Sequence, residues 1–115
     1  MSEPFDKEEL LEELDGDFEF LAETYGMFTE DAGDLLKRLD EAVAKSDCNT
    51  VSTAAHTIKS MVGNFFATPA FQAALELETL GKSNDLADAP AKLEKLQLEV
   101  DRLGRALGDL LEGQG

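Results

Sequence analysis

One apolar stripe near the end of the chain limits the possible folds more than any other feature. Leucine or valine recurs every three or four residues, at Leu93, Leu96, Val100, Leu103, Leu107 and Leu110. This spacing returns side chains to one side of a helix, whereas a half-buried strand would alternate with a period of two. The stripe therefore predicts a long amphipathic helix that must bury one face against other elements.

Three earlier segments have the same helical period. Their apolar positions predict helices over residues 17–45, over about 51–66 and from 68 to about 81. A short first helix is expected over 6–14, because Asp6 and a glutamate three residues later form a capping-box pattern. The sequence therefore predicts an all-α fold, an antiparallel four-helix bundle with a short additional N-terminal helix.

Local signals within these helices leave some details open. Thr68 followed by Pro69 predicts the cap of the fourth helix. Gly26 and Gly33 interrupt the long second helix, where they predict a bend or close helix packing. The terminal stripe has a heptad-like rhythm that could serve the core of one bundle or the seam of a coiled-coil dimer. We expect a monomer and keep the dimer as the alternative.

Length, composition and charge exclude several classes of protein. The 115 residues fit one domain, expected over 1–115, and no stretch approaches the roughly 20 apolar residues that cross a bilayer. One cysteine and one histidine cannot build an ordinary zinc site, so no metal is expected. The formal charge of -15 opposes binding to nucleic acid or to an anionic membrane. The acidic N-terminus lacks a signal-peptide pattern, so we expect a cytoplasmic protein.

The one histidine of the chain, His56, is expected to face solvent. On a helical projection of residues 51–66, the apolar side chains fall on one face and His56 falls on the other. A flat protein surface can approach an imidazole whose neighbours are small, and a single lysine can reach anionic oxygens placed on the ring. The neighbours at one or two turns are Ser52, Thr53, Lys59, Ser60 and Gly63.

The segment around His56 also has an unusual charge pattern. Residues 48–75 contain no acidic residue, although 25 acids in 115 residues would place about six there. A crowded helical hairpin would account for this, but several polar positions in the segment would have accepted glutamate equally well. We interpret the segment as a patch kept free of negative charge for a phosphoryl dianion.

Residues 55–67, AHTIKSMVGNFFA, resemble the signature of histidine-phosphotransfer (HPt) domains, in which an A-H-x-L-K-G start is followed by a glycine and often an asparagine. The resemblance extends over nearly the whole chain and includes the pair Leu77-Glu78. Ser60 and Phe66 stand where members of the family usually have glycine. The residues that match the signature are Ala55, His56, Ile58, Lys59, Gly63 and Asn64.

This resemblance implies a phosphoryl carrier and not an enzyme with its own turnover. His56 would exchange a phosphoryl group with the aspartate of a response-regulator receiver domain in a two-component phosphorelay, and a hybrid sensor histidine kinase is a further expected partner. Lys59 would interact with the phosphoryl oxygens. No cofactor is expected on this chain, since the Mg²⁺ belongs to the receiver. Docking space beside the imidazole would come from Ser52, Ser60, Gly63 and Asn64.

Other functions fit parts of the sequence. A helical adaptor in which His56 is never phosphorylated would have the same stripes, caps and net charge, so only the surroundings of His56 and the resemblance favour the carrier. Gly81-Lys82-Ser83 resembles the end of a P-loop, but Glu76 stands where that motif needs glycine. A Ser-His-Asp triad is not indicated, because no acid that could orient His56 is evident.

Overall fold

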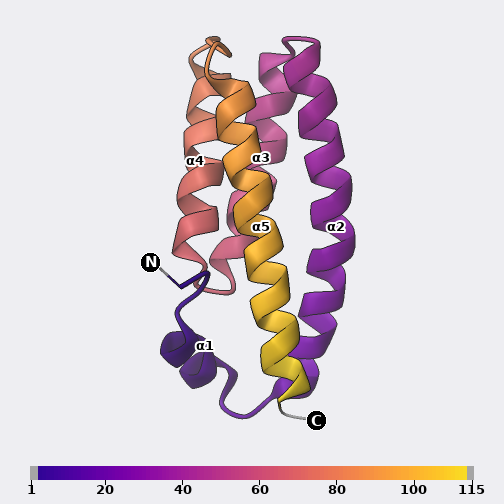
Figure 1. Ribbon diagram of the computed structural model, residues 1–115, viewed down its shortest axis with the longest axis vertical. Coiled ribbons are helices and arrows are strands. Elements are labelled where there is room, and N and C mark those ends of the chain that lie inside the picture. The colour runs from indigo at the N-terminus through magenta and orange to yellow at the C-terminus, as the bar shows by residue number, and fades with distance from the viewer. Residues whose placement is uncertain (1–2, 114–115) are drawn as a thin grey trace.

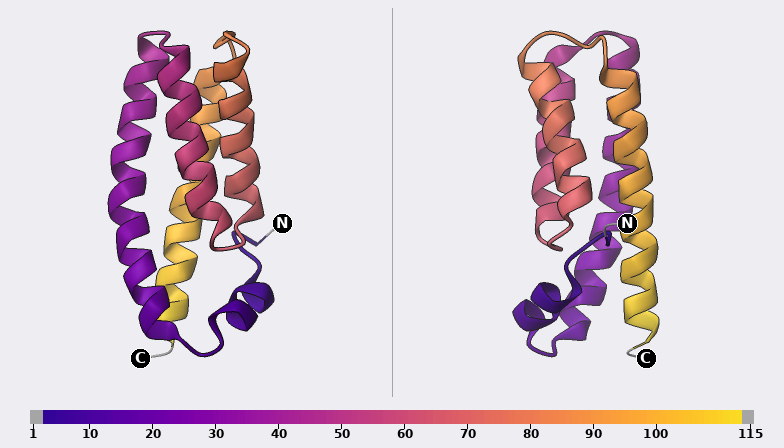
Figure 2. Two further views of the ribbon diagram at one scale, coloured as in Figure 1. Left: turned by 180° about the vertical axis from the view of Figure 1, so that it is seen from behind. Right: turned by 60° about the vertical axis from the view of Figure 1, so that its left-hand side comes forward.

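Five helices account for most of residues 3–113, the part of the chain that the computed structural model describes. The four long helices run antiparallel to their neighbours, and the short one lies at the end of the bundle where the first long helix begins (Figure 1 and Figure 2). The predicted all-α four-helix bundle with a short leading helix is confirmed. The elements are α1 (Lys7–Leu14), α2 (Phe18–Ala44), α3 (Cys48–Gly63), α4 (Thr68–Lys82) and α5 (Ala89–Glu112).

Aspartate caps begin the first three helices. Asp6, Asp17 and Asp47 each accept a backbone N–H three residues further on, at 3.1, 3.0 and 3.1 Å. Thr50 donates both its hydroxyl and its backbone N–H to Asp47, and these two bonds lower the pKa of the Asp47 carboxyl. Local hydrogen bonding thus sets where α1, α2 and α3 begin.

Thr68 does not cap α4, contrary to the sequence prediction. Thr68 is already helical, Ala67 occupies the cap position, and no side chain makes a capping bond there. Pro69 lies in the first turn, where a backbone N–H has no partner within the helix, so its missing N–H costs nothing. The start of α4 therefore depends on the proline and not on a polar cap.

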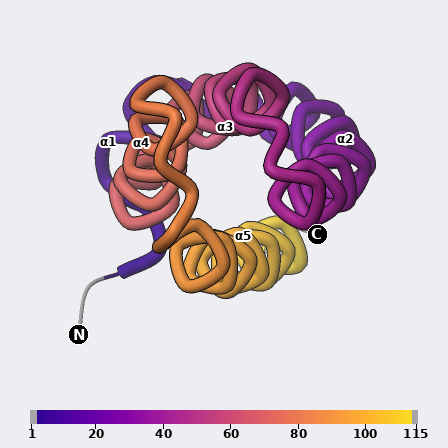
Figure 3. The backbone as a smooth tube through the Cα atoms, turned by 90° about the horizontal axis from the view of Figure 1, so that it is seen from above, coloured from indigo at the N-terminus to yellow at the C-terminus, as the bar shows by residue number. Residues whose placement is uncertain are grey.

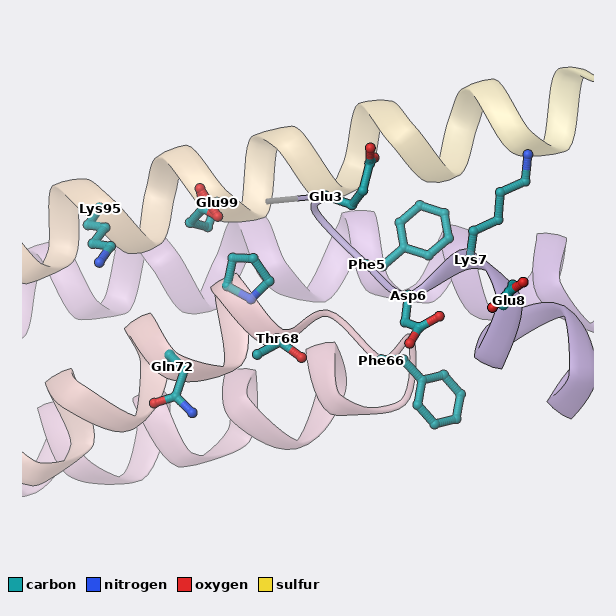
Figure 4. Close-up of a pocket in the computed structure, with 11 residues that line it drawn as sticks. Glu3, Phe5, Asp6, Lys7, Glu8, Phe66, Thr68, Gln72, Lys95 and Glu99 are labelled. Carbon is teal, nitrogen blue, oxygen red and sulfur yellow. The ribbon is translucent and has the colours of Figure 1, made fainter. Parts of the chain in front are cut away.

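The turn between α3 and α4 is built around Phe66. This residue has a φ of 57°, in the left-handed region that glycine adopts most easily, so the helix predicted over about 51–66 already ends at Gly63. The carbonyl oxygen of Phe66 accepts the backbone N–H of Asp6 at 2.9 Å. Figure 4 shows the N-terminal segment around Phe5 and Asp6 passing beside this turn. The turn is thus tied to the segment that precedes α1.

Side chains from all four long helices form one core. Seen along the bundle, α2, α3, α4 and α5 surround a common interior (Figure 3). The whole apolar stripe of α5 is buried in it, so the stripe serves the bundle and is not available as the seam of a coiled coil. The largest fully buried side chains include Leu21, Leu39, Ile58, Leu77, Leu96, Leu103 and Leu107.

Within residues 3–113, no helix is both long and apolar enough to cross a membrane.

Helices α3 and α4 approach each other closely at Gly81. A Cβ atom on Gly81 would lie 2.7 Å from the backbone nitrogen of Ser52 and 2.8 Å from the carbonyl oxygen of Cys48. Gly26 and Gly33, where the sequence suggested a bend or close packing, have no such neighbour within 4 Å. Gly81 is therefore a position at which helix packing requires glycine, because only a residue without a Cβ lets the two backbones come so near.

This contact predicts a specific sensitivity. Gly81→Ala should lower the free energy of unfolding by about 1–3 kcal/mol, because the added methyl group overlaps backbone atoms that cannot move independently. Gly33→Ala should be neutral or stabilising by up to about 1 kcal/mol, because it adds helix propensity in open space. Urea denaturation of the two variants measures both effects. Equal stabilisation by the two substitutions would show that α3 and α4 do not touch at Gly81.

Candidate functional site

His56 stands on the outer side of α3 with one ring nitrogen held by a carboxylate. Its side chain is 59% exposed, as the helical projection led us to expect. Nδ1 lies 2.9 Å from Oε2 of Glu78, a residue of α4 whose own side chain is only 3% exposed. A buried acid from the neighbouring helix therefore fixes the position of an exposed imidazole.

This contact decides which nitrogen of the ring carries the proton. Glu78 has a pKa of about 2, so near neutral pH it is ionised and can only accept a hydrogen bond. In the neutral imidazole, Nδ1 must then donate to Glu78, and Nε2 keeps the free lone pair. Nε2 is on the opposite edge of the ring from Nδ1, so the nucleophilic nitrogen points away from Glu78.

Glu78 is compensated by two lysines as well as by the imidazole. Nζ of Lys59 lies 2.7 Å from Oε1, and Nζ of Lys82 lies 3.2 Å from Oε2. The hydrogen bond from Lys59 is the largest cause of the lowered pKa of Glu78; burial acts in the opposite direction, and Lys82 and His56 add to the lowering. We call these four residues the Glu78 cluster. With a neutral imidazole it carries a net charge of +1, in a chain whose net charge is -15.

Lys59 is enclosed by its surroundings. Its side chain is 19% exposed, and its ammonium group lies 5.9 Å from the centre of the Phe71 ring as well as against Glu78. A Cβ atom on Gly63 would lie 3.5 Å from the same ring. Gly63, expected to leave room beside the imidazole, therefore faces Phe71 of α4, and a larger residue there would press on the ring that covers Lys59.

The other predicted docking residues differ in exposure. Ser60 and Asn64 are exposed on α3, whereas Ser52 is half-buried where α4 approaches at Gly81. The hydroxyl of Ser60 donates to the carbonyl oxygen of His56 at 3.2 Å, within its own helix. Ser60 therefore presents a small, internally bonded side chain one turn from the imidazole.

Two expectations from the sequence need correction at Glu78. An acid that orients His56 does exist, although none was evident in the sequence. The surroundings of His56 are also not free of acids, because α4 returns along α3 and brings a carboxylate to the ring. This carboxylate is buried and more than balanced by Lys59 and Lys82, so the local charge is still positive.

The geometry of a helical hairpin could have identified Glu78. In an antiparallel pair, residues equally far from the turn lie opposite each other, and His56 is eleven residues before Ala67 whereas Glu78 is eleven after it. Gly63 and Phe71 are opposed in the same way, four residues on either side of Ala67. A search for acids at the position opposite His56 would therefore have found its partner.

The rest of the described structure offers few other candidates for a functional site. A broad hollow lies between the N-terminal segment, α4 and α5, and its lining includes Lys95 and the buried acid Glu99 (Figure 4). Glu99 is already paired with Arg102 at 2.6 Å. Within residues 3–113, no three His, Cys, Asp or Glu side chains converge where they could hold a metal ion. The Glu78 cluster is therefore our candidate functional site.

The buried charge of Glu78 predicts a pH-dependent effect on stability. Glu78→Gln should lower the free energy of unfolding by about 2 kcal/mol near neutral pH, because it leaves Lys59 without its anionic partner. The carboxyl has a pKa of about 2 in the folded chain against a reference value of 4.5, so its stabilising effect is complete above about pH 4.5 and is lost as the pH falls towards 2. Denaturation at several pH values should therefore show the two proteins converging in acid.

A neighbouring acid on α4 supplies the control. Glu76 is 41% exposed and lies 3.5 Å from Lys92, so Glu76→Gln should change stability by less than about 0.5 kcal/mol at any pH. A stability gap between wild type and Glu78→Gln that stayed constant from neutral pH to acid would contradict the assigned ionisation of Glu78.

A comparison with known protein families found a match over most of the chain. Residues 23–106 match the model of the Hpt domain, and the matched range contains the whole Glu78 cluster but not α1. No curated protein and no solved structure gave a match. The family match covers well over half of the 115 residues, and helical bundles are what the family forms. The chain therefore belongs to the family of Hpt domains, the helical bundles that carry phosphoryl groups in phosphorelays.

Proposed function

We propose that this chain accepts a phosphoryl group on Nε2 of His56 from the aspartate of a receiver domain and passes it on by the reverse reaction. The observation that carries the proposal is the hydrogen bond between Nδ1 of His56 and Glu78, which leaves the free lone pair on Nε2. The His56 side chain is 59% exposed, so a partner can reach this nitrogen. Membership of the Hpt domain family supports the general role.

The chemical step needs one nucleophile on this chain. The Nε2 lone pair attacks the phosphorus of the aspartyl phosphate, an N–P bond forms, and the P–O bond breaks with its electrons returning to the aspartate carboxylate. Alignment and neutralisation of charge account for most catalysis of phosphoryl transfer, and the Mg²⁺ and lysine of the receiver would supply them on the partner side. The chain is then a carrier that returns to its starting state only by giving up the phosphoryl group.

Glu78 contributes to both directions of this reaction. Attack by Nε2 leaves the ring positively charged with its proton still on Nδ1, and the Glu78 carboxylate 2.9 Å away stabilises that charge. A ring that keeps its proton is also a better leaving group when the phosphoryl group moves on. Glu78 therefore acts as a positioning residue, because it acts through the imidazole and not on the phosphoryl group itself.

The partner would dock over the exposed part of α3. Ser60 and Asn64 are small or polar and exposed on the helix of His56, so a receiver surface can come close to the ring. Lys59 adds positive charge near the imidazole while it stays against Glu78. Hybrid kinases contain receiver domains, so they would use the same surface.

The first test concerns the phosphorylated residue. After incubation with a phosphorylated receiver domain, the wild-type chain should carry acid-labile, base-stable phosphate, and His56→Gln should carry none. The fold should survive, with a change in unfolding free energy below about 1 kcal/mol, because the side chain is largely exposed. Label on wild type and His56→Gln alike would mean that another residue is modified, and no label on wild type with several donors would favour a helical adaptor.

The second test concerns the docking surface. Ser60→Leu should lower the rate of transfer from a receiver about tenfold, or about 1.4 kcal/mol, because leucine would hold the partner away from the imidazole. Thr29→Leu is a matched control, since Thr29 is also exposed and also donates its hydroxyl within its own helix, to Gly26 at 3.0 Å on α2. Equal transfer rates for Ser60→Leu and Thr29→Leu would show that the partner approaches from another side.

A further inference from the structure

The two lysines of the Glu78 cluster differ in how firmly they are held. Lys59 is 19% exposed, lies 2.7 Å from Oε1 of Glu78 and has the Phe71 ring on another side. Lys82 is 67% exposed, lies 3.2 Å from Oε2 and is close to the end of α4. Moving Lys59 would break a nearly buried ion pair, whereas Lys82 can leave Glu78 by rotation of a solvated side chain.

Lys82 is also within reach of the imidazole. Its Nζ and Nδ1 of His56 both contact Oε2 of Glu78, at 3.2 and 2.9 Å, so these two nitrogen atoms are at most about 6 Å apart. The lysine stem has four flexible carbons, which can carry the ammonium group across the ring edge to a substituent on Nε2. The Lys82 ammonium group, which is paired with Glu78 in this structure, can thus move to a phosphoryl group on His56.

We propose that phosphorylation of His56 draws the Lys82 ammonium group from Glu78 to the phosphoryl oxygens, while Lys59 stays on Glu78. The inference rests on the proposed function and adds to it a phosphoryl-binding residue outside the segment that resembles the HPt signature. It assigns the direct contact to Lys82 and leaves Lys59 the task of holding the carboxylate in place.

The exchange keeps every charge of the cluster paired. Before transfer, Glu78 is balanced by Lys59 and Lys82 beside a neutral ring. After transfer, the ring is positively charged and faces Glu78, so the carboxylate needs only Lys59 in addition. Lys82 is then free to bind the phosphoryl dianion, and an ammonium–phosphoryl contact is stronger than a contact with a carboxylate that is already neutralised.

The test uses the full chain and phosphoramidate, a small donor whose P–N bond breaks with loss of ammonia as the N–P bond to His56 forms. We expect Lys82→Met to lower the rate of phosphorylation about two- to fivefold at low ionic strength, the change that loss of one exposed ion pair would cause. Added salt should reduce this difference because it screens the charges. Lys82→Arg should restore most of the rate. Lys92→Met removes the same charge from a lysine paired with Glu76 and should react like the wild type.

Nuclear magnetic resonance of the lysine ammonium groups gives a readout that does not depend on rate. On phosphorylation the Lys82 resonance should move and the Lys59 resonance should stay, and the ³¹P shift of the phosphorylated chain should change in Lys82→Met but not in Lys92→Met. Movement of the Lys59 resonance alone, or an unchanged ³¹P shift in Lys82→Met, would overturn the exchange and leave the proposed function standing. A wild-type chain that never gains phosphate on His56 would overturn the proposed function and the exchange with it.

Discussion

The contact between α3 and α4 at Gly81 determines the spacing on which the site depends. The backbones meet there because glycine lacks a Cβ, and the contact with Ser52 lies one helical turn from the pair formed by His56 and Glu78. A glutamate side chain is short, so it can reach an imidazole on the next helix only where the two axes are close. A larger residue at Gly81 would separate the helices and lengthen the hydrogen bond that orients the ring.

Because Glu78 is buried close to His56, its ionisation determines which nitrogen of the imidazole carries the proton. A carboxylate that is almost inaccessible to water must be paired, and here the partners are two ammonium groups and one imidazole. These partners keep the carboxylate ionised, and an ionised acceptor leaves the ring one choice of proton position. The identity of the nucleophilic nitrogen therefore depends both on the packing that buries Glu78 and on the charges that keep it ionised.

The sequence predicts the helices well and the site only in part, for a physical reason. Periodic apolar positions act within a helix, so the stripe of α5 and the outward side of His56 could be predicted without knowledge of the neighbours. Glu78 becomes a partner of His56 only through the register of two helices across a turn, and helical period carries no such information. Phe66 illustrates the same limit, since its left-handed conformation explains why glycine is usual there but depends on the turn and the N-terminal segment.

The open position of His56 has a consequence for how long a signal could be stored. Because the His56 side chain is 59% exposed, a phosphoryl group bound to it would be in contact with water. Between partners, the lifetime of such a group would be set by solvent and a few nearby charges. A bundle built in this way would rely on the chemistry of the N–P bond, and not on shielding by the protein, to keep a phosphoryl group until the next partner arrives.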